Sequence, residues 1–147
     1  MRLILAAAIV AVPVLAHADA IEDALEARHG YMKMLAINMG TLSGMAKGEI
    51  EYDAEAAGRA GTNLQALTGY DLPSLFIEGT SNADVDDSEA LPAIWENSAD
   101  FASKFAGLQE AAGAAAASLG SGADAVGPAV QQLGGACKAC HDDYRED

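Results

Sequence analysis

Apolar side chains recur at alternating spacings of three and four residues in four segments of this 147-residue chain. Such spacing places them along one face of an α-helix, and that face must be buried against another element. The first segment runs from about Ile21 to Ala46, and its stripe consists of Leu25, Arg28, Met32, Leu35, Met39 and Leu42. A long helix with one inward face is therefore expected here.

Three further helices follow the same rhythm. Asp53 is a suitable N-cap for the second, which runs to about Leu67 with Ala57, Gly61 and Leu64 facing inward. The third begins at Pro92, and its stripe is Ile94, Ser98, Phe101, Phe105, Leu108, Ala112, Ala115 and Leu119. The fourth begins near Asp124, and its stripe is Val126, Val130, Leu133, Cys137, Cys140 and Tyr144.

The connection from Tyr70 to Leu91 is rich in Asp, Ser, Gly, Thr and Pro, which makes it too polar for a helix, and its one apolar island is residues 75–77. No segment shows the pattern of a strand. Four amphipathic helices with one long crossover predict an all-α fold, an antiparallel four-helix bundle.

The N-terminus has the pattern of a secretory signal peptide. Met-Arg is followed by an apolar run from Leu3 to Leu15 and then by small residues. Cleavage is expected after Ala18 or Ala20, and the run is too short to span a bilayer comfortably. We therefore expect residues 1–18 to be removed on export to the periplasm, leaving residues 19–147 as one domain that is not membrane-spanning.

The chain is strongly acidic, with 22 Asp and Glu against 8 Lys and Arg and a net charge of −14, which becomes −15 when Arg2 is lost with the signal peptide. This charge excludes nucleic acid as a plausible partner. It favours encounter with redox partner proteins that have basic docking surfaces, although a solvated acidic exterior without a partner fits equally well.

The motif that carries chemistry is Cys137-Lys138-Ala139-Cys140-His141. Two thiols three residues apart on a helix can form thioethers to the two vinyl groups of one haem. His141 follows Cys137 by four residues and shares its helical face, so it can bind the haem iron.

Other uses of these cysteines fit the sequence less well. A redox dithiol of the thioredoxin kind normally opens a helix after a strand. A zinc site needs four good ligands, and beyond the predicted signal peptide the chain offers only two cysteines, His29 and His141.

Together the signal peptide, the four helices and the haem motif close to the C-terminus resemble class II cytochromes c, the cytochrome c′ superfamily. Further likeness lies in Arg28, Tyr52-Asp53, Pro92-Ala93-Ile94-Trp95 and residues 137–145. The resemblance implies one covalently bound haem c with its iron. It also implies that Arg145 lies near the proximal histidine or a haem propionate, although Arg145 could instead be a solvated cation at the helix end.

In this family the residue that faces the iron from the first helix separates electron carriers from gas binders, and the matching position is Met32. Arg28 is the only charge on the inward stripe, and a buried arginine needs an anion, for which a haem propionate is available. Arg28 would then place Met32 over the porphyrin, where its thioether can bind iron.

Alternatives to Met32 stay open. Met32 could simply fill the core, as Met34, Met39 and Met45 show that the chain uses methionine freely. Met39 is a weaker candidate ligand on the same stripe, and His29 could bind iron only if the helix were rotated.

The resulting expectation is a periplasmic mono-haem electron carrier, low-spin and ligated by His141 and Met32, and not an enzyme. The alternative is a high-spin cytochrome c′ that binds nitric oxide or carbon monoxide at an open distal site. A haem-free helical module with a redox dithiol is the third possibility.

Other residues carry weaker expectations. The aromatic residues expected to pack in the core or against the haem are Trp95, Phe101, Phe105 and Tyr144. Asp142 and Asp143 are assigned to the acidic surface. The chain is expected to be a monomer or a homodimer, and the small residues that could form a dimer interface or simply allow close packing are Ala36, Gly40, Ala57 and Gly61.

Overall fold

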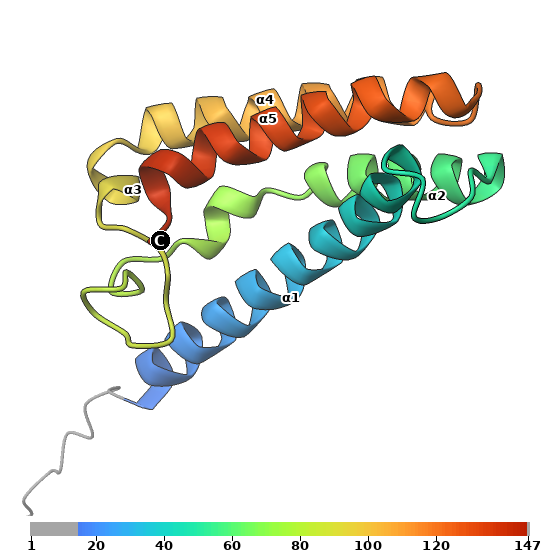
Figure 1. Cartoon of the computed structure of the whole chain (residues 1–147). Coiled ribbons are helices and arrows are strands. Elements are labelled where there is room, and N and C mark those ends of the chain that lie inside the picture. Colours follow the sequence, from blue (N-terminus) through green and yellow to red (C-terminus); the bar gives the residue numbers. More distant parts are fainter. Residues whose placement is uncertain (1–14, 147) are drawn as a thin grey trace, which may run out of the picture.

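A computed structural model describes the backbone of residues 15–146 and the side chains of residues 19–146. Its elements are α1 (Leu15–Ala46), α2 (Ala54–Thr68), η1 (Leu72–Leu75), α3 (Ala93–Glu96), α4 (Ser98–Ser118), η2 (Ala123–Ala125) and α5 (Val126–Tyr144). The described residues contain no strand and one isolated β-bridge, between Ala90 and Arg145. Around the bundle the helices follow the order α1, α2, α4, α5, and each packs against the next, with α5 packing against α1 (Figure 1). The predicted four-helix bundle is confirmed.

The predicted stripes form the core. Leu42, Leu64 and Leu133 are fully buried, one from each of α1, α2 and α5, and they belong to the same core cluster as Leu119, just beyond the end of α4. A Cβ on Gly61 would lie 2.9 Å from Leu119 Cδ1 and 3.1 Å from the backbone Cα of Ala116. The missing side chain of Gly61 therefore lets α2 and α4 approach closely at this end of the bundle.

Helix ends follow the local sequence. The Asp53 carboxylate accepts a hydrogen bond from the N–H of Ala56, as predicted for the N-cap of α2. Pro73 stands in the first turn of η1, where a missing N–H costs nothing. Because η1 is a short 3-10 helix, the prediction that residues 70–91 hold no helix was wrong over this one turn.

The predicted single helix from Pro92 to Leu119 was also wrong, because it is broken into α3 and α4 at Asn97. Asn97 has φ −128° and ψ 42°, and its side-chain amide donates to the carbonyl of Ala93. An asparagine that bonds the preceding turn in this way competes with the helical backbone. As a result Ser98, expected to face inward, is exposed, and the buried stripe of α4 begins at Phe101.

Most of the predicted signal peptide lies outside the described residues, and the two expected cleavage positions, Ala18 and Ala20, lie in the first turns of α1. Within the described part of the chain, no helix combines the length and the apolar character that crossing a membrane requires. Ala57 and Gly61 are buried inside the bundle, which favours close helix packing, the second of their two expected roles, whereas Ala36 and Gly40 are exposed.

Candidate functional site

A cavity of about 530 Å³ opens between α1, α4 and α5 and is lined mainly by apolar side chains. It lies in the part of the bundle that the connection and α3 also border, where α1 diverges from α4 and α5 (Figure 1). Its wall contains every residue that the sequence analysis assigned to haem, namely Arg28, Met32, Cys137, Cys140, His141 and Arg145. Its volume is in the range of cofactor sites.

Cys137 and Cys140 are partly buried and form no disulfide. Burial raises the pKa of the Cys140 thiol to about 11 and also raises that of Cys137. As long as no group is attached to them, both cysteines therefore stay protonated at neutral pH. Redox-active dithiols instead have lowered pKa values, so the environment of the pair does not favour the dithiol alternative.

His141 is half-buried beside the two cysteines, and its Nδ1 lies 3.5 Å from Nη1 of Arg145. Burial lowers the pKa of His141, and the positive charge of Arg145 lowers it further. The imidazole is thus biased toward the neutral form that a metal ligand needs. Arg145 has left the helix and is extended, with its Nε 3.9 Å from a Glu89 carboxylate oxygen.

Arg28 is only 5% exposed. Its Nη2 donates to the carbonyl of Thr80 at 3.1 Å and to the Ser88 hydroxyl at 3.5 Å, and its guanidinium lies 4.7 Å from the centre of the Phe76 ring. Its Nη1 is buried without a hydrogen-bond partner among the described residues. An unpaired charged donor in the wall of a cavity fits a group that brings its own carboxylate, as haem does.

Met32 lies one helical turn beyond Arg28, partly buried on the cavity wall and packed against the main core. Met39 lines the same cavity, whereas Met34 is 47% exposed on another face of α1. His29 reaches the cavity edge but is exposed, and its Nδ1 lies 3.8 Å from Asp87. The stripe of α1 is buried in the expected register, so no rotation of the helix brings His29 inward.

Lys104 of α4 also lines the cavity, although it was not among the predicted site residues. Its Nζ lies 2.9 Å from Asp143 and 3.7 Å from Asp100, so Asp143 is more than a generic surface charge. The sequence did contain a sign of this position, because Lys104 follows Phe101 by three residues and so lies on the inward side of α4.

Aromatic rings form one side of the cavity. Phe76, Phe101 and Tyr144 all line it, with ring centroids 4.9 Å apart for Phe76 and Phe101 and 5.3 Å for Phe101 and Tyr144. Trp95 packs behind them, where its indole N–H donates to the carbonyl of Phe76. The predicted packing role fits these residues, and Phe76 is a member that the sequence did not single out.

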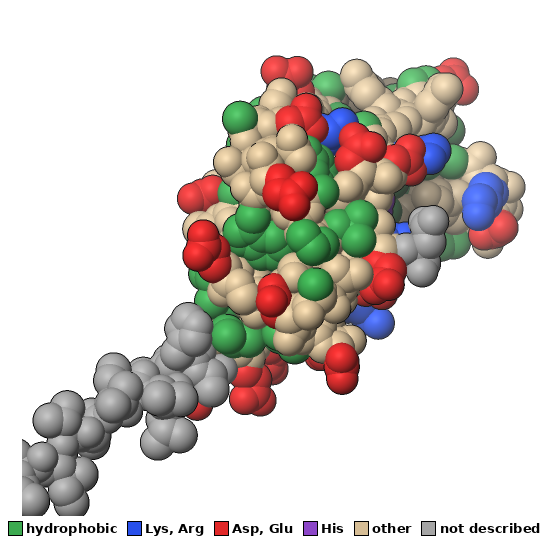
Figure 2. All heavy atoms as spheres, turned by 90° about the vertical axis from the view of Figure 1, so that its left-hand side faces the viewer, with side chains coloured by type: hydrophobic (Ala, Val, Ile, Leu, Met, Phe, Trp, Pro, Cys, Tyr) green, Lys and Arg blue, Asp and Glu red, His purple; other side chains and the backbone are tan. Residues whose placement is uncertain are grey.

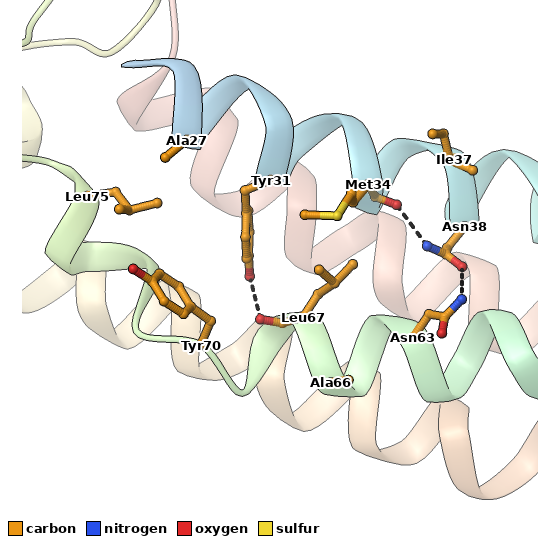
Figure 3. A pocket seen from close by; sticks show the side chains of 10 residues that line it. All are labelled: Ala27, Tyr31, Met34, Ile37, Asn38, Asn63, Ala66, Leu67, Tyr70 and Leu75. Atoms are coloured by element: carbon orange, nitrogen blue, oxygen red, sulfur yellow. Dashed lines mark hydrogen bonds between the residues drawn. The ribbon is translucent and has the colours of Figure 1, made fainter. Parts of the chain in front are cut away.

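A second hollow, of about 670 Å³, is a groove on the outside of α1 and α2. Tyr31, Met34 and Leu67 point into it, and Asn63 donates across it to Asn38 (Figure 3). None of its ten lining residues is charged, and three of them, Met34, Ile37 and Tyr70, are among the most exposed large apolar side chains. This groove shares no residue with the cavity.

Comparisons with known proteins agree with this site. The family model described as Cytochrome C' matches residues 23–145. Cytochrome c-554 of Cereibacter sphaeroides is 47% identical over 94% of this chain and 91% of its own length, and cytochrome c' of the same organism is 41% identical over 98% and 97%. A cytochrome c-556 of Agrobacterium tumefaciens is 40% identical over 82% of this chain and 95% of its own.

Solved structures extend the comparison. The cytochrome c' from "Rhodobacter Spheriodes" has a TM-score of 0.83 and 41% identity, covering 86% of this chain and 98% of that one. A nitric oxide complex of a mutant cytochrome c prime from Alcaligenes xylosoxidans has a TM-score of 0.75 and 28% identity over 86% and 97%. The chain therefore belongs to the cytochrome c′ family of four-helix c-type cytochromes, whose cofactor is one covalently attached haem c with its iron.

Proposed function

We propose that Cys137 and Cys140 hold the haem by thioether bonds and that His141 binds its iron. The spacing of the three residues supports this assignment, as does their position in one wall of a largely apolar cavity. Arg28 would bind a haem propionate through its unpaired Nη1, and Arg145 would orient the imidazole of His141 from 3.5 Å. When bound, the haem supplies an iron that changes oxidation state by one electron and that can hold a diatomic gas.

The function that these observations support best is binding of nitric oxide or carbon monoxide at an open iron position on the α1 side. The observation that carries it is the apolar character of that wall, where Met32 and Leu35 of α1 lie with Phe105 of α4. These three side chains bring no hydrogen-bonding group beyond the Met32 thioether, so this part of the wall suits a small neutral molecule, and Arg28 one turn away is assigned to a propionate. Members of the cytochrome c′ family are typically high-spin and bind these gases, which agrees with this proposal.

Electron transfer with low-spin iron, ligated by His141 and Met32, is the second candidate. It is the first expectation from the sequence, and the comparisons favour it less than gas binding. The specific observation in its favour is that Met32 brings a thioether to the cavity wall one turn from Arg28. Neither electron transfer nor gas binding is catalysis of a reaction, so we expect no enzymatic turnover.

An absorption spectrum of the purified protein separates the two candidates. Gas binding predicts a high-spin ferrous spectrum that shifts at once when carbon monoxide is added, and the spin state should be the same in Met32→Ala. A Met-to-iron charge-transfer band that Met32→Ala abolishes would instead establish the electron carrier. Met39→Ala is the matched control, because Met39 lines the same cavity. A denatured chain that retains no haem stain would contradict haem attachment altogether.

The expected location is the periplasm, because residues 1–18 have the pattern of a signal peptide. Acidic side chains surround an apolar centre on the end of the molecule that carries α3 and the connection (Figure 2). The connection contributes exposed Asp86, Asp87 and Glu89, and Glu89 also lines the haem cavity. A partner protein that exchanges electrons here would therefore present a basic surface.

A second copy of the chain is the occupant we propose for the groove of α1 and α2. The groove combines a hollow with projecting apolar side chains, Ile37 at 61% exposed and Met34 at 47%, so the surface can be complementary to itself. Its lack of charge matters because two copies of a −14 chain repel each other elsewhere. Ile37→Glu should shift the sedimentation coefficient from dimer to monomer, whereas Ile50→Glu, outside the groove, should not.

A further inference from the structure

Lys104 lies in a small ionic cluster that joins α4 to the end of α5. Its Nζ lies 2.9 Å from an Asp143 oxygen and 3.7 Å from an Asp100 oxygen, and the Tyr144 hydroxyl donates to the same Asp100 oxygen at 2.7 Å. Asp143 and Tyr144 follow His141 by two and three residues. The cluster therefore fixes the position of the Lys104 ammonium relative to the haem-binding turn.

The two signs of charge in this cluster are not equally screened by water. The Lys104 side chain is 23% exposed and lines the cavity, whereas the Asp143 and Asp100 side chains are each 57% exposed and do not line it. Charges that lie in an apolar wall act over a few ångströms with much less screening than charges in water. The electrostatic potential inside the cavity is therefore set more by the Lys104 ammonium than by the two carboxylates.

Other charged groups face the same cavity, but each is balanced or distant from this wall. Arg28 belongs to α1 and would be neutralised by a propionate in the proposed haem site. Arg145 is paired with Glu89, which lines the cavity beside it, and His29 is exposed and next to Asp87. Lys104 is the cation that α4 adds to the cavity wall, on the side of Cys140 and Tyr144.

We propose that Lys104 sets the reduction potential of the haem, its ammonium being held at the cavity wall by Asp143 and Asp100. The oxidised centre carries one more positive charge than the reduced one, so a nearby fixed cation destabilises the oxidised state and raises the potential. The couple concerned is the addition of one electron, supplied by a small-molecule mediator, to ferric haem to give ferrous haem. The inference rests on the proposed haem site and holds whether or not Met32 binds the iron.

The test is a spectroelectrochemical titration of the haem-bearing protein with Lys104→Met and Lys138→Met as a matched pair. Both variants lose one positive charge, but Lys138 is 73% exposed and pairs with Asp142 on its own helix. Lys104→Met should lower the midpoint potential, and by clearly more than Lys138→Met. The small effect of Lys138→Met should vanish at high ionic strength, while the effect of Lys104→Met should persist.

Two more variants keep the test decisive. Lys104→Gln removes the positive charge but keeps a polar side chain, and should lower the potential as Lys104→Met does. Lys104→Arg should keep the potential close to that of the parent protein, which a purely structural role would not predict. Equal potentials for Lys104→Met and Lys138→Met, or a rise in Lys104→Met, would overturn the proposal. If Lys104→Met does not accumulate, the shift in Lys104→Gln decides. Absence of covalent haem in the parent protein is a different failure, that of the proposed haem site itself.

Discussion

Replacement of Arg28 by methionine tests whether the buried guanidinium is held by the cofactor. Without haem, two opposing effects nearly balance. The hydrogen bond to the Thr80 carbonyl and the contact with the Phe76 ring favour the arginine, by about 1.5–3 and about 1–2 kcal/mol respectively. The unpaired Nη1 and the loss of water around a charge that is 5% exposed oppose it by several kcal/mol.

With haem attached as proposed, the balance would change because Nη1 would gain a carboxylate. Removing one member of a buried ion pair leaves the other charge unpaired and costs about 3–5 kcal/mol. Thr80 keeps a partner in the variant, because the Ser88 hydroxyl donates to the same carbonyl at 2.7 Å. Most of the loss in Arg28→Met should therefore come from the pair with the propionate.

Urea unfolding of the haem-bearing protein measures this cost. With a slope of about 2 kcal/mol/M for a domain of this size, the midpoint should fall by roughly 1.5–2.5 M in Arg28→Met. Arg59→Met is the control, since Arg59 is exposed and pairs with Glu55 on the same helix, a contact worth less than about 0.5 kcal/mol. Equal midpoints for the two variants would show that Arg28 has no anionic partner.

Three other predictions concern the bundle and the attachment. Gly61→Val should lose about 1–3 kcal/mol in thermal unfolding through overpacking against α4, whereas Gly58→Ala, with open space around the new Cβ, should gain up to about 1 kcal/mol. The hydrogen bond from Tyr144 to Asp100 and the burial of Tyr31 raise the pKa of each phenol to about 12. The stabilisation linked to these raised pKa values should be fully present below about pH 10, the ordinary pKa of a phenol, and should be lost between about pH 10 and 12. In denaturant titrations over that window, the Phe variants should lose less of their unfolding free energy. Intact-mass spectrometry of the exported protein should find one haem bound to the denatured chain, and none when Cys137 and Cys140 are both replaced by serine.

Much of the candidate site could be predicted from local sequence because its key residues lie on two helix faces, one in α1 and one in α5. Cys137, Cys140 and His141 are fixed by spacing within α5, and Arg28 and Met32 by spacing within α1. The break at Asn97 could not be predicted in the same way, because asparagine is tolerated inside helices and only its bond to Ala93 reveals the end of α3. The partners of Arg28 were equally hidden, since Thr80 and Ser88 lie 52 and 60 residues away in a connection without periodicity.

The two ends of the bundle differ in how they are filled, and this difference supports the proposed position of the cofactor. Where α2 packs against α4, Ala57 and Gly61 leave no room between the helices. Around α3 and the connection, α2 has ended, and the space beside α1 is bordered by the large rings of Phe76 and Phe101 instead of a fourth helix. Rings of this size form a wide apolar wall but do not close the cavity, whose volume is about 530 Å³. A flat apolar cofactor attached to α5 as proposed would complete the core at that end, so the residues that shape this wall should act on stability and on the iron together.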